Sequence, residues 1–177
     1  GAVPAALTAL LPELVRSDAV HLTSDAAWRS PLRAAGVAHT VRFADERSLQ
    51  CELVGAVRST KSRGLALVVS STRRGAELAV YTLQEAAITL VDASAEKPRP
   101  REREAALERF ASGDAAVLVT TDAALRSLEP PNVAHVIGID LPSSMQEYAG
   151  RLRFTGRHGH SGLCTTLVGD DSPAAVL

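Results

Sequence analysis

The chain has 177 residues, 46% of them hydrophobic and 22% charged, which suits one globular domain with a short appendage and excludes two domains of ordinary size. Its net charge of −1 gives no general attraction to nucleic acid or membranes, so any polyanion site must be a local group of Lys and Arg. No apolar run reaches the roughly 18 residues of a membrane span, and no basic and apolar leader opens the chain, so we expect a soluble, intracellular protein.

The first 30 residues are predicted to form a segment separate from the domain that follows. A helix is expected over residues 5–15, followed by a short apolar run at 19–22 and then a polar stretch. We interpret residues 1–30 as the tail of a preceding domain or an interdomain linker. Residues 31–177 are predicted to form the domain itself.

Within that domain, apolar runs bounded by turn residues alternate with amphipathic segments. This pattern is typical of strands buried on both faces under crossover helices, so we predict an α/β fold. The predicted strands are 38–43, 65–70, 88–91, 116–120, 135–139 and 162–168. The predicted helices are 46–58, 74–85, 101–112 and 144–152.

Small hydroxyl residues, glycine and arginine recur just after four of the predicted strands. In an open parallel sheet, ligands bind beyond the carboxyl ends of the strands, where helix N-termini present free N–H groups. Hydroxyl and N–H groups can cradle phosphate oxygens, and guanidinium groups neutralise their charge. One phosphate-binding face is therefore expected, formed by residues 71–75, 99–103, 121–122 and 151–157.

Other residue types give little sign of a site. Cys51 and Cys164 lie far apart without paired spacing, and His158 and His160 have no cysteine or carboxylate at ligand spacing, so we predict no metal site and no disulfide. Aromatic residues make up only 3% of the chain, which argues against recognition of bases by stacking. Recognition of a nucleic-acid backbone would not need them.

Four stretches carry a resemblance to a known family. They are LALVVSSTRRGA at 65–76, REREAALERFASG at 101–113, VLVTTDAALRSLE at 117–129 and EYAGRLRFTGR at 147–157. In this order and spacing they resemble motif IV, its following helix, motif V and motif VI of the second RecA-like domain of DEAD-box RNA helicases. The resemblance covers about residues 38–168. It implies a RecA-like, doubly wound, mainly parallel sheet with helices on both faces.

The resemblance also implies which residues meet RNA. Carried over to this chain, Thr72 and Gly75 approach the sugar-phosphate backbone, Arg103 pairs with one phosphate, and Thr121 offers its hydroxyl and N–H to another. Two plainer explanations stay open. Arg103 also suits the solvated first turn of an amphipathic helix, and Thr121 also suits a helix cap, which is compatible with phosphate binding.

Motif VI departs from the family pattern at three positions. Gly150 stands where the family has His, Arg153 where it has Gly, and Phe154 where it has one of two arginine fingers for the γ-phosphate of ATP. Such a finger contributes about 10³–10⁵ in rate. Arg153 is one residue away, which turns a helical side chain by about 100°, so we expect it to point elsewhere. Arg157 is kept as the remaining candidate for a catalytic finger.

Motif V and the preceding turn depart as well, with Ser127 in place of Gly, Glu129 in place of Asp, and Pro100 in place of Gln. The resemblance implies nucleotide or interdomain contacts for four residues, namely Arg126, Glu129, Arg151 and Arg157. Asp122 is expected to cap or orient. Because the departures fall on the nucleotide side while the core pattern is intact, we expect an impaired ATPase.

The leading hypothesis is the second lobe of a DEAD-box-type helicase that binds RNA through its backbone and acts as an RNA- or protein-binding module. The alternatives are half of an active ATP-dependent RNA helicase, and an α/β domain that binds proteins or small molecules. ATP and Mg²⁺ are expected only at an interface with a first RecA-like lobe, so this chain alone should not hydrolyse ATP. The expected partners are RNA, that first lobe and further proteins, but no membrane.

Overall fold

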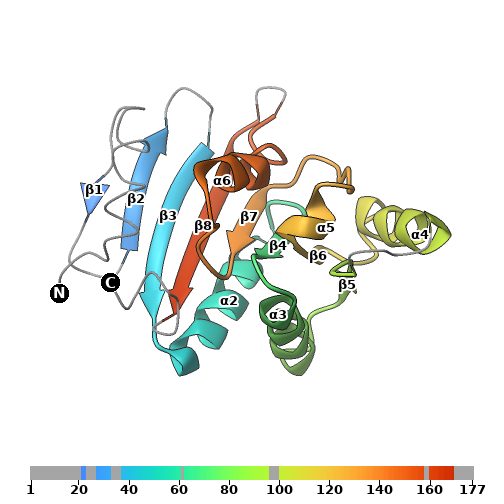
Figure 1. Ribbon diagram of the computed structural model, residues 1–177, viewed down its shortest axis with the longest axis horizontal. Coiled ribbons are helices and arrows are strands. Elements are labelled where there is room, and N and C mark those ends of the chain that lie inside the picture. Colours follow the sequence, from blue (N-terminus) through green and yellow to red (C-terminus); the bar gives the residue numbers. More distant parts are fainter. Residues whose placement is uncertain are drawn as a thin grey trace.

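The computed structural model describes residues 21–22, 27–32, 37–60, 62–95, 100–157 and 160–169. Within these ranges the strands form one sheet in the order β1-β2-β3-β8-β7-β4-β6-β5 (Figure 1). The strands are β1 (His21–Leu22), β2 (Ala27–Leu32), β3 (Val37–Ala44), β4 (Ala66–Ser70), β5 (Leu90–Asp92), β6 (Val117–Thr121), β7 (His135–Gly138) and β8 (Gly162–Gly169). The helices are α2 (Glu46–Thr60), α3 (Arg73–Glu85), α4 (Pro100–Ala111), α5 (Asp122–Leu125) and α6 (Met145–Leu152).

The central strands are buried on both faces because alternate residues of each strand point to opposite sides of the sheet. Val68 of β4 packs in one core with residues of α2 and α3, whereas its neighbour Leu67 packs in a second core with Phe110 of α4 and Leu125 of α5. Across the sheet, all neighbouring strands from β3 through β8, β7, β4 and β6 to β5 pair in parallel. The predicted α/β fold, with a mainly parallel sheet between two helical layers, is confirmed. Among the described helices, none is long and apolar enough to cross a membrane.

The register of the sheet brings functional segments of the sequence to one edge. β4 lies between β7 and β6, and its last residue Ser70 is paired with Thr121, the last residue of β6. β7 ends at Gly138, and Asp140 follows two residues later. Since parallel strands end on the same side of the sheet, the segments after β4, β6 and β7 meet there.

The strand β2 was not predicted. It pairs antiparallel with β3, and the predicted boundary between residues 30 and 31 falls inside it. Pro31 lies in this strand, and in the sequence a proline argues against a strand because it has no N–H to donate to a neighbouring strand. The predicted helix at 5–15 lies outside the described residues.

The remaining elements lie close to their predicted positions. The predicted strand at 88–91 is observed at Leu90–Asp92, and the short helix α5 was not predicted. At four residues, α5 is too short to show a helical period in the sequence.

Candidate functional site

The centre of the carboxyl edge is an ion-pair network around Arg151. Its Nε and Nη2 donate to the two carboxylate oxygens of Asp122 at 2.8 and 2.6 Å, and Nη2 also donates to Asp140 Oδ1 at 2.9 Å. Asp140 in turn accepts hydrogen bonds from the Ser70 hydroxyl at 2.6 Å and the Ser71 hydroxyl at 2.9 Å. One buried arginine therefore links the ends of β4, β6 and β7 to α6.

The environment of Arg151 keeps its guanidinium charged. Burial alone would lower the pKa of Arg151, but hydrogen bonds and charge from Asp122, and then Asp140, outweigh it, so the net shift of the pKa is upward. Only 2% of the side chain is exposed. A side chain on Gly138 would lie 2.7 Å from Arg151 Nη1, so the network also requires glycine there. The observed contacts of Arg151 are internal, and its predicted nucleotide or interdomain contact stays a prediction.

Thr72 and Gly75 lie at the start of α3, next to this network. Thr72 is exposed and caps α3, since its hydroxyl accepts a hydrogen bond from the Gly75 N–H at 3.1 Å. A Cβ on Gly75 would collide with Ser70 Oγ, which is held by Asp140. Glycine at residue 75 is therefore required by local packing, whatever its role toward RNA.

Thr121 and Arg103 lie on the other side of the network, around α5. Thr121 caps α5 by accepting a hydrogen bond from the Ala124 N–H at 3.2 Å, and it is only 3% exposed. Arg103 of α4 is half-buried, and its Nη1 donates to the Ser127 carbonyl at 3.5 Å, a weak bond. The cap that we left open for Thr121 is thus present, and Arg103 is anchored beside the end of α5 rather than fully solvated.

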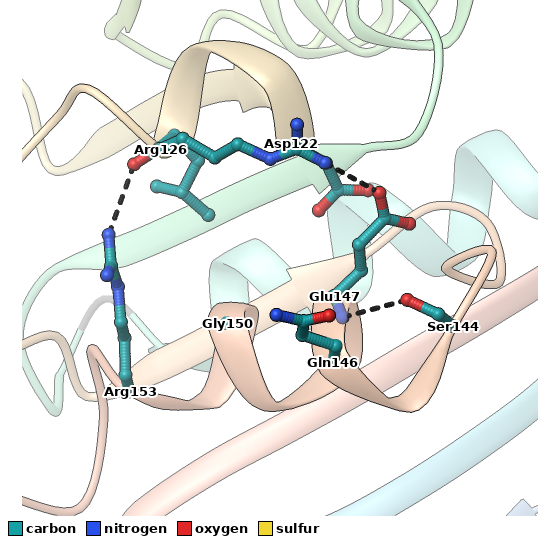
Figure 2. Close-up of a pocket in the computed structure, with 8 residues that line it drawn as sticks. Asp122, Arg126, Ser144, Gln146, Glu147, Gly150 and Arg153 are labelled. Atoms are coloured by element: carbon teal, nitrogen blue, oxygen red, sulfur yellow. Dashed lines mark hydrogen bonds and ion pairs between the residues drawn. The ribbon is translucent and has the colours of Figure 1, made fainter.

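A pocket with a volume of about 580 Å³ lies between α5 and α6 (Figure 2). Its lining residues are Asp122, Leu125, Arg126, Ser144, Gln146, Glu147, Gly150 and Arg153. Arg126 extends from α5 to Glu147 of α6 and forms an ion pair of 3.1 Å across the pocket. Hydrogen bonds from Ser143, followed by the charges of Arg126 and Arg151, lower the pKa of Glu147 despite some burial.

The end of α6 places Phe154 in the core and leaves the neighbouring arginines outside. Phe154 is 2% exposed and packs with core residues, and its carbonyl accepts a hydrogen bond from Val133 N–H at 2.8 Å. Arg153 is exposed and lies 4.5 Å from the centre of the Phe154 ring, while the half-buried Arg157 lies 5.2 Å from it. The Arg153 guanidinium thus stacks on the Phe154 ring, and the expectation that Arg153 cannot replace the missing finger stays a prediction.

Of the other predicted nucleotide-side residues, Arg126 has 72% of its side chain exposed despite its ion pair, and Glu129 is exposed near the end of α5. Arg126 pairs with Glu147 of α6, and Arg151 of α6 pairs with Asp122 of α5, so both arginines join α6 to the α5 segment. Asp140 is a site residue that we did not single out. It follows the predicted strand at 135–139, so the same rule that picked out residues 71–75 and 121–122 would have found it.

Replacing Gly150 by Ala should raise the free energy of unfolding by roughly 0.5–1 kcal/mol, because a helix-interior glycine is less favourable than alanine by about that amount. A Cβ at Gly150 would meet no atom within 4 Å. Gly55 of α2 is equally open, so Gly55→Ala should give a similar gain. Urea denaturation followed by circular dichroism measures both. A loss of stability in Gly150→Ala alone would show that the pocket wall does not tolerate a methyl group.

The family Helicase conserved C-terminal domain matches residues 46–159, more than half of the chain. Among solved structures, the chain is similar to the RNA-helicase Prp28 from Chaetomium thermophilum bound to ADP, at 26% identity and a TM-score of 0.65, covering 75% of this chain and 33% of that one. It is also similar to the E. coli DEAD-box protein SrmB bound to regulator of ribonuclease activity A, at 28% identity and a TM-score of 0.62. The match covers 74% of this chain and 78% of the SrmB chain. A third match is a hypothetical ATP-dependent RNA helicase from Sulfolobus tokodaii, at 26% identity and a TM-score of 0.63. This match covers 77% of this chain and 39% of that one. The chain thus spans about a third of the Prp28 chain.

Proposed function

Since the chain belongs to the helicase conserved C-terminal domain family, as a RecA-like second domain of the DEAD-box type, we propose that it binds the sugar-phosphate backbone of RNA as one half of a two-lobed protein. The observation that carries this proposal is the arrangement of hydroxyl, N–H and guanidinium groups along one edge of the sheet. Thr72 and Gly75 follow β4, Thr121 ends the neighbouring β6, and Arg103 is anchored beside α5.

These groups suit phosphate recognition and do not suit base recognition. Thr72 is exposed, and the weak 3.5 Å bond of Arg103 leaves most of its donors free to meet a phosphate oxygen. Thr121 is the least accessible of the four, so its contribution would come with a small opening around α5. Backbone recognition also agrees with the aromatic content of 3%.

The nucleotide side of the proposal concerns the two-lobed protein. ATP and Mg²⁺ would lie between this domain and a first RecA-like lobe, with Arg126, Glu129, Arg151 and Arg157 on this side. The Prp28 structure that the chain resembles holds ADP. Of these residues, Arg126 and Glu129 are exposed and Arg157 is half-buried, whereas the buried Arg151 would act by positioning the strand ends.

Impaired ATP hydrolysis is the second part of the proposal. Phe154 occupies the position where the resemblance implies an arginine finger, and its ring is buried. Replacing it with arginine would place a charge in the core, so this position is committed to packing rather than to a γ-phosphate. Arg157 is the remaining candidate for a finger, and it lies against the same ring.

The substitution Arg103→Ala should weaken the binding of single-stranded RNA by about five- to tenfold, since a charge-assisted phosphate contact contributes on the order of 1–1.5 kcal/mol at an exposed site. Arg109→Ala, an exposed arginine further along α4, is the matched control and should change affinity by less than twofold. Fluorescence anisotropy with labelled RNA at low salt measures both variants. Equal losses in the two would point to general charge attraction and contradict the proposed face.

Binding of a protein partner is a second candidate function, favoured by one observation. Leu78 and Tyr81, three residues apart and therefore neighbours on α3, are 36% and 60% exposed and offer a small apolar contact surface. SrmB, which the chain resembles, was solved bound to a protein regulator. Two results together would favour protein binding over RNA binding. The parent chain would fail to bind RNA at low salt, and the Tyr81→Ser variant would lose a protein partner that the parent binds.

A further inference from the structure

The outward face of α3 carries a stripe of four exposed side chains. This α3 stripe consists of Arg74, Leu78, Tyr81 and Glu85. With 3.6 residues per turn, the four positions lie within about 60° of one another around the helix axis, so their side chains form one row. The opposite face of α3 packs into the core that it shares with α2, beside which it lies at the lower rim of the domain in Figure 1. The row therefore faces away from the domain.

The two charges of the α3 stripe oppose the dipole of their own helix. A helix N-terminus favours acidic side chains and a C-terminus favours basic ones, but α3 has no acidic residue in its first turn and no basic residue in its last. Arg73 is paired with Glu77 at 2.9 Å, whereas Arg74 and Glu85 have no ion pair within the part of the chain that the structure describes. These two lie roughly 16 Å apart along the helix axis, too far to pair with each other. The local fold therefore accounts for neither charge.

The α3 stripe is complementary to itself when its direction is reversed, because it presents a cation, two apolar side chains and an anion in order. An antiparallel second copy, related by a two-fold axis between Leu78 and Tyr81, would place these two side chains against each other. At both ends, Arg74 of one copy would meet Glu85 of the other. A parallel copy would instead set like charges together. The antiparallel arrangement also places Arg74 near the C-terminus of the other helix, where a cation is favourable.

We propose that two copies of this domain associate through the α3 stripe as a symmetric, antiparallel dimer. This inference names the occupant of the exposed surface of Leu78 and Tyr81, so it rests on protein binding, the second candidate function, and not on RNA binding. The apolar pair forms the centre of the contact and the two ion pairs form its rim, as is typical of protein interfaces. One helix pair covers less than the roughly 1,200 Å² of a stable interface, so the dissociation constant should be on the order of 100 µM.

Sedimentation equilibrium of this chain between about 10 µM and 1 mM tests the association. Arg74→Glu and Glu85→Arg should each raise the dissociation constant by about tenfold or more, because each change turns both intermolecular ion pairs into contacts between like charges. Both changes suit the dipole of α3, so neither should unfold the helix, and circular dichroism checks this. The matched controls Arg109→Glu and Glu104→Arg reverse exposed charges on α4 and should change the constant by less than twofold.

An equimolar mixture of the two single variants tests the antiparallel geometry. In a dimer of one Arg74→Glu chain and one Glu85→Arg chain, both rim contacts again join opposite charges. The mixture should therefore associate about as tightly as the parent, although neither variant does so alone. The double variant, which has the net charge of the parent, should also recover the dimer, which excludes general attraction between oppositely charged chains.

Three results would overturn the dimer. They are a chain that stays monomeric at about 1 mM, a dimer that withstands both single substitutions, and a mixture of the two variants that does not associate. A monomeric chain would leave the binding of a different protein to the Tyr81→Ser experiment and the binding of RNA to the anisotropy measurement. Failure of this proposal is thus distinct from failure of either proposed function.

Discussion

Replacing Arg151 with Met should lower the free energy of unfolding by about 3–5 kcal/mol, the usual cost of removing one partner from a buried ion pair. The variant would leave Asp122, which is 8% exposed, without its bidentate partner. It would also remove the link from α6 to Asp140 and Ser71 at the ends of the neighbouring strands. Urea denaturation followed by circular dichroism measures the loss.

An exposed ion pair is the matched control for this experiment. Arg73 pairs with Glu77 at 2.9 Å while 70% of its side chain is exposed, so Arg73→Met should cost no more than about 0.5 kcal/mol. Adding Asp122→Asn to Arg151→Met should restore part of the lost stability, because the double variant no longer buries an unpaired charge. A loss below about 1 kcal/mol in Arg151→Met would contradict the structural role of the network. If Arg151→Met does not fold, Arg151→Lys provides the milder test of the same bonds.

The domain should lose on the order of 4 kcal/mol of stability between pH 7.5 and pH 5, because two histidines are buried in the neutral form. Burial lowers the pKa of His39 from 6.5 to about 4. Burial, followed by the charges of Arg63 and Arg42, lowers the pKa of His135 to about the same value. In the unfolded chain both groups take up protons near their ordinary pKa of 6.5.

The direction of this pH dependence follows from proton binding. Between pH 6.5 and 4 the unfolded chain binds more protons than the folded one, so stability is complete above pH 6.5 and falls as the pH is lowered. In that window each histidine lowers the free energy of unfolding by about 1.4 kcal/mol per pH unit, which amounts to roughly 2 kcal/mol at pH 5. Below about pH 4 these two groups no longer change the stability.

The surroundings of both histidines agree with neutral rings. Thr60 donates its hydroxyl to the Ala56 carbonyl, so His135 Nδ1–H donates to Thr60 Oγ1 at 2.7 Å, and His135 Nε2 then accepts the Thr165 hydroxyl at 2.8 Å. His39 Nδ1 lies 2.5 Å from the Tyr148 hydroxyl, and burial raises the pKa of this tyrosine, so the phenol is protonated and can share a hydrogen bond with a neutral ring.

Urea midpoints of the chain at pH 7.5 and pH 5 measure the effect, and a His39→Phe variant should show about half the pH dependence. Equal stability at the two pH values would show that the histidines are not buried as described. A variant with the full pH dependence of the parent would show that His39 takes no part in it.

The sequence predicted the parts of the site that depend on local pattern. The run at 65–70 and the run at 116–120 identified β4 and β6, and the rule that ligands bind beyond strand ends placed Thr72 and Thr121 on one edge. The paired register of Ser70 and Thr121 then confirmed that the two segments meet.

Features that depend on contacts distant in the sequence were not predictable. The nucleotide or interdomain contact expected for Arg151 stays a prediction, whereas its bonds to Asp122 and Asp140, which lie 29 and 11 positions earlier, were not foreseen. Phe154 was considered only as the residue in place of an arginine finger, and the sequence did not show that its ring enters the core beside Val133. Neither contact leaves a period or a spacing signal in the sequence.

The measurement that tests the central claim most directly is the salt dependence of RNA binding by this chain. If the domain holds RNA through phosphates, single-stranded RNA of unrelated sequences should bind with similar affinity at about 50 mM salt, and log K should fall linearly with log salt, with a slope of about −0.7 for each phosphate contacted. We expect a slope that corresponds to two to four phosphates, and a smaller slope in Arg103→Ala. No binding at low salt, an affinity that is independent of salt, or a strong preference for one RNA sequence would contradict the account.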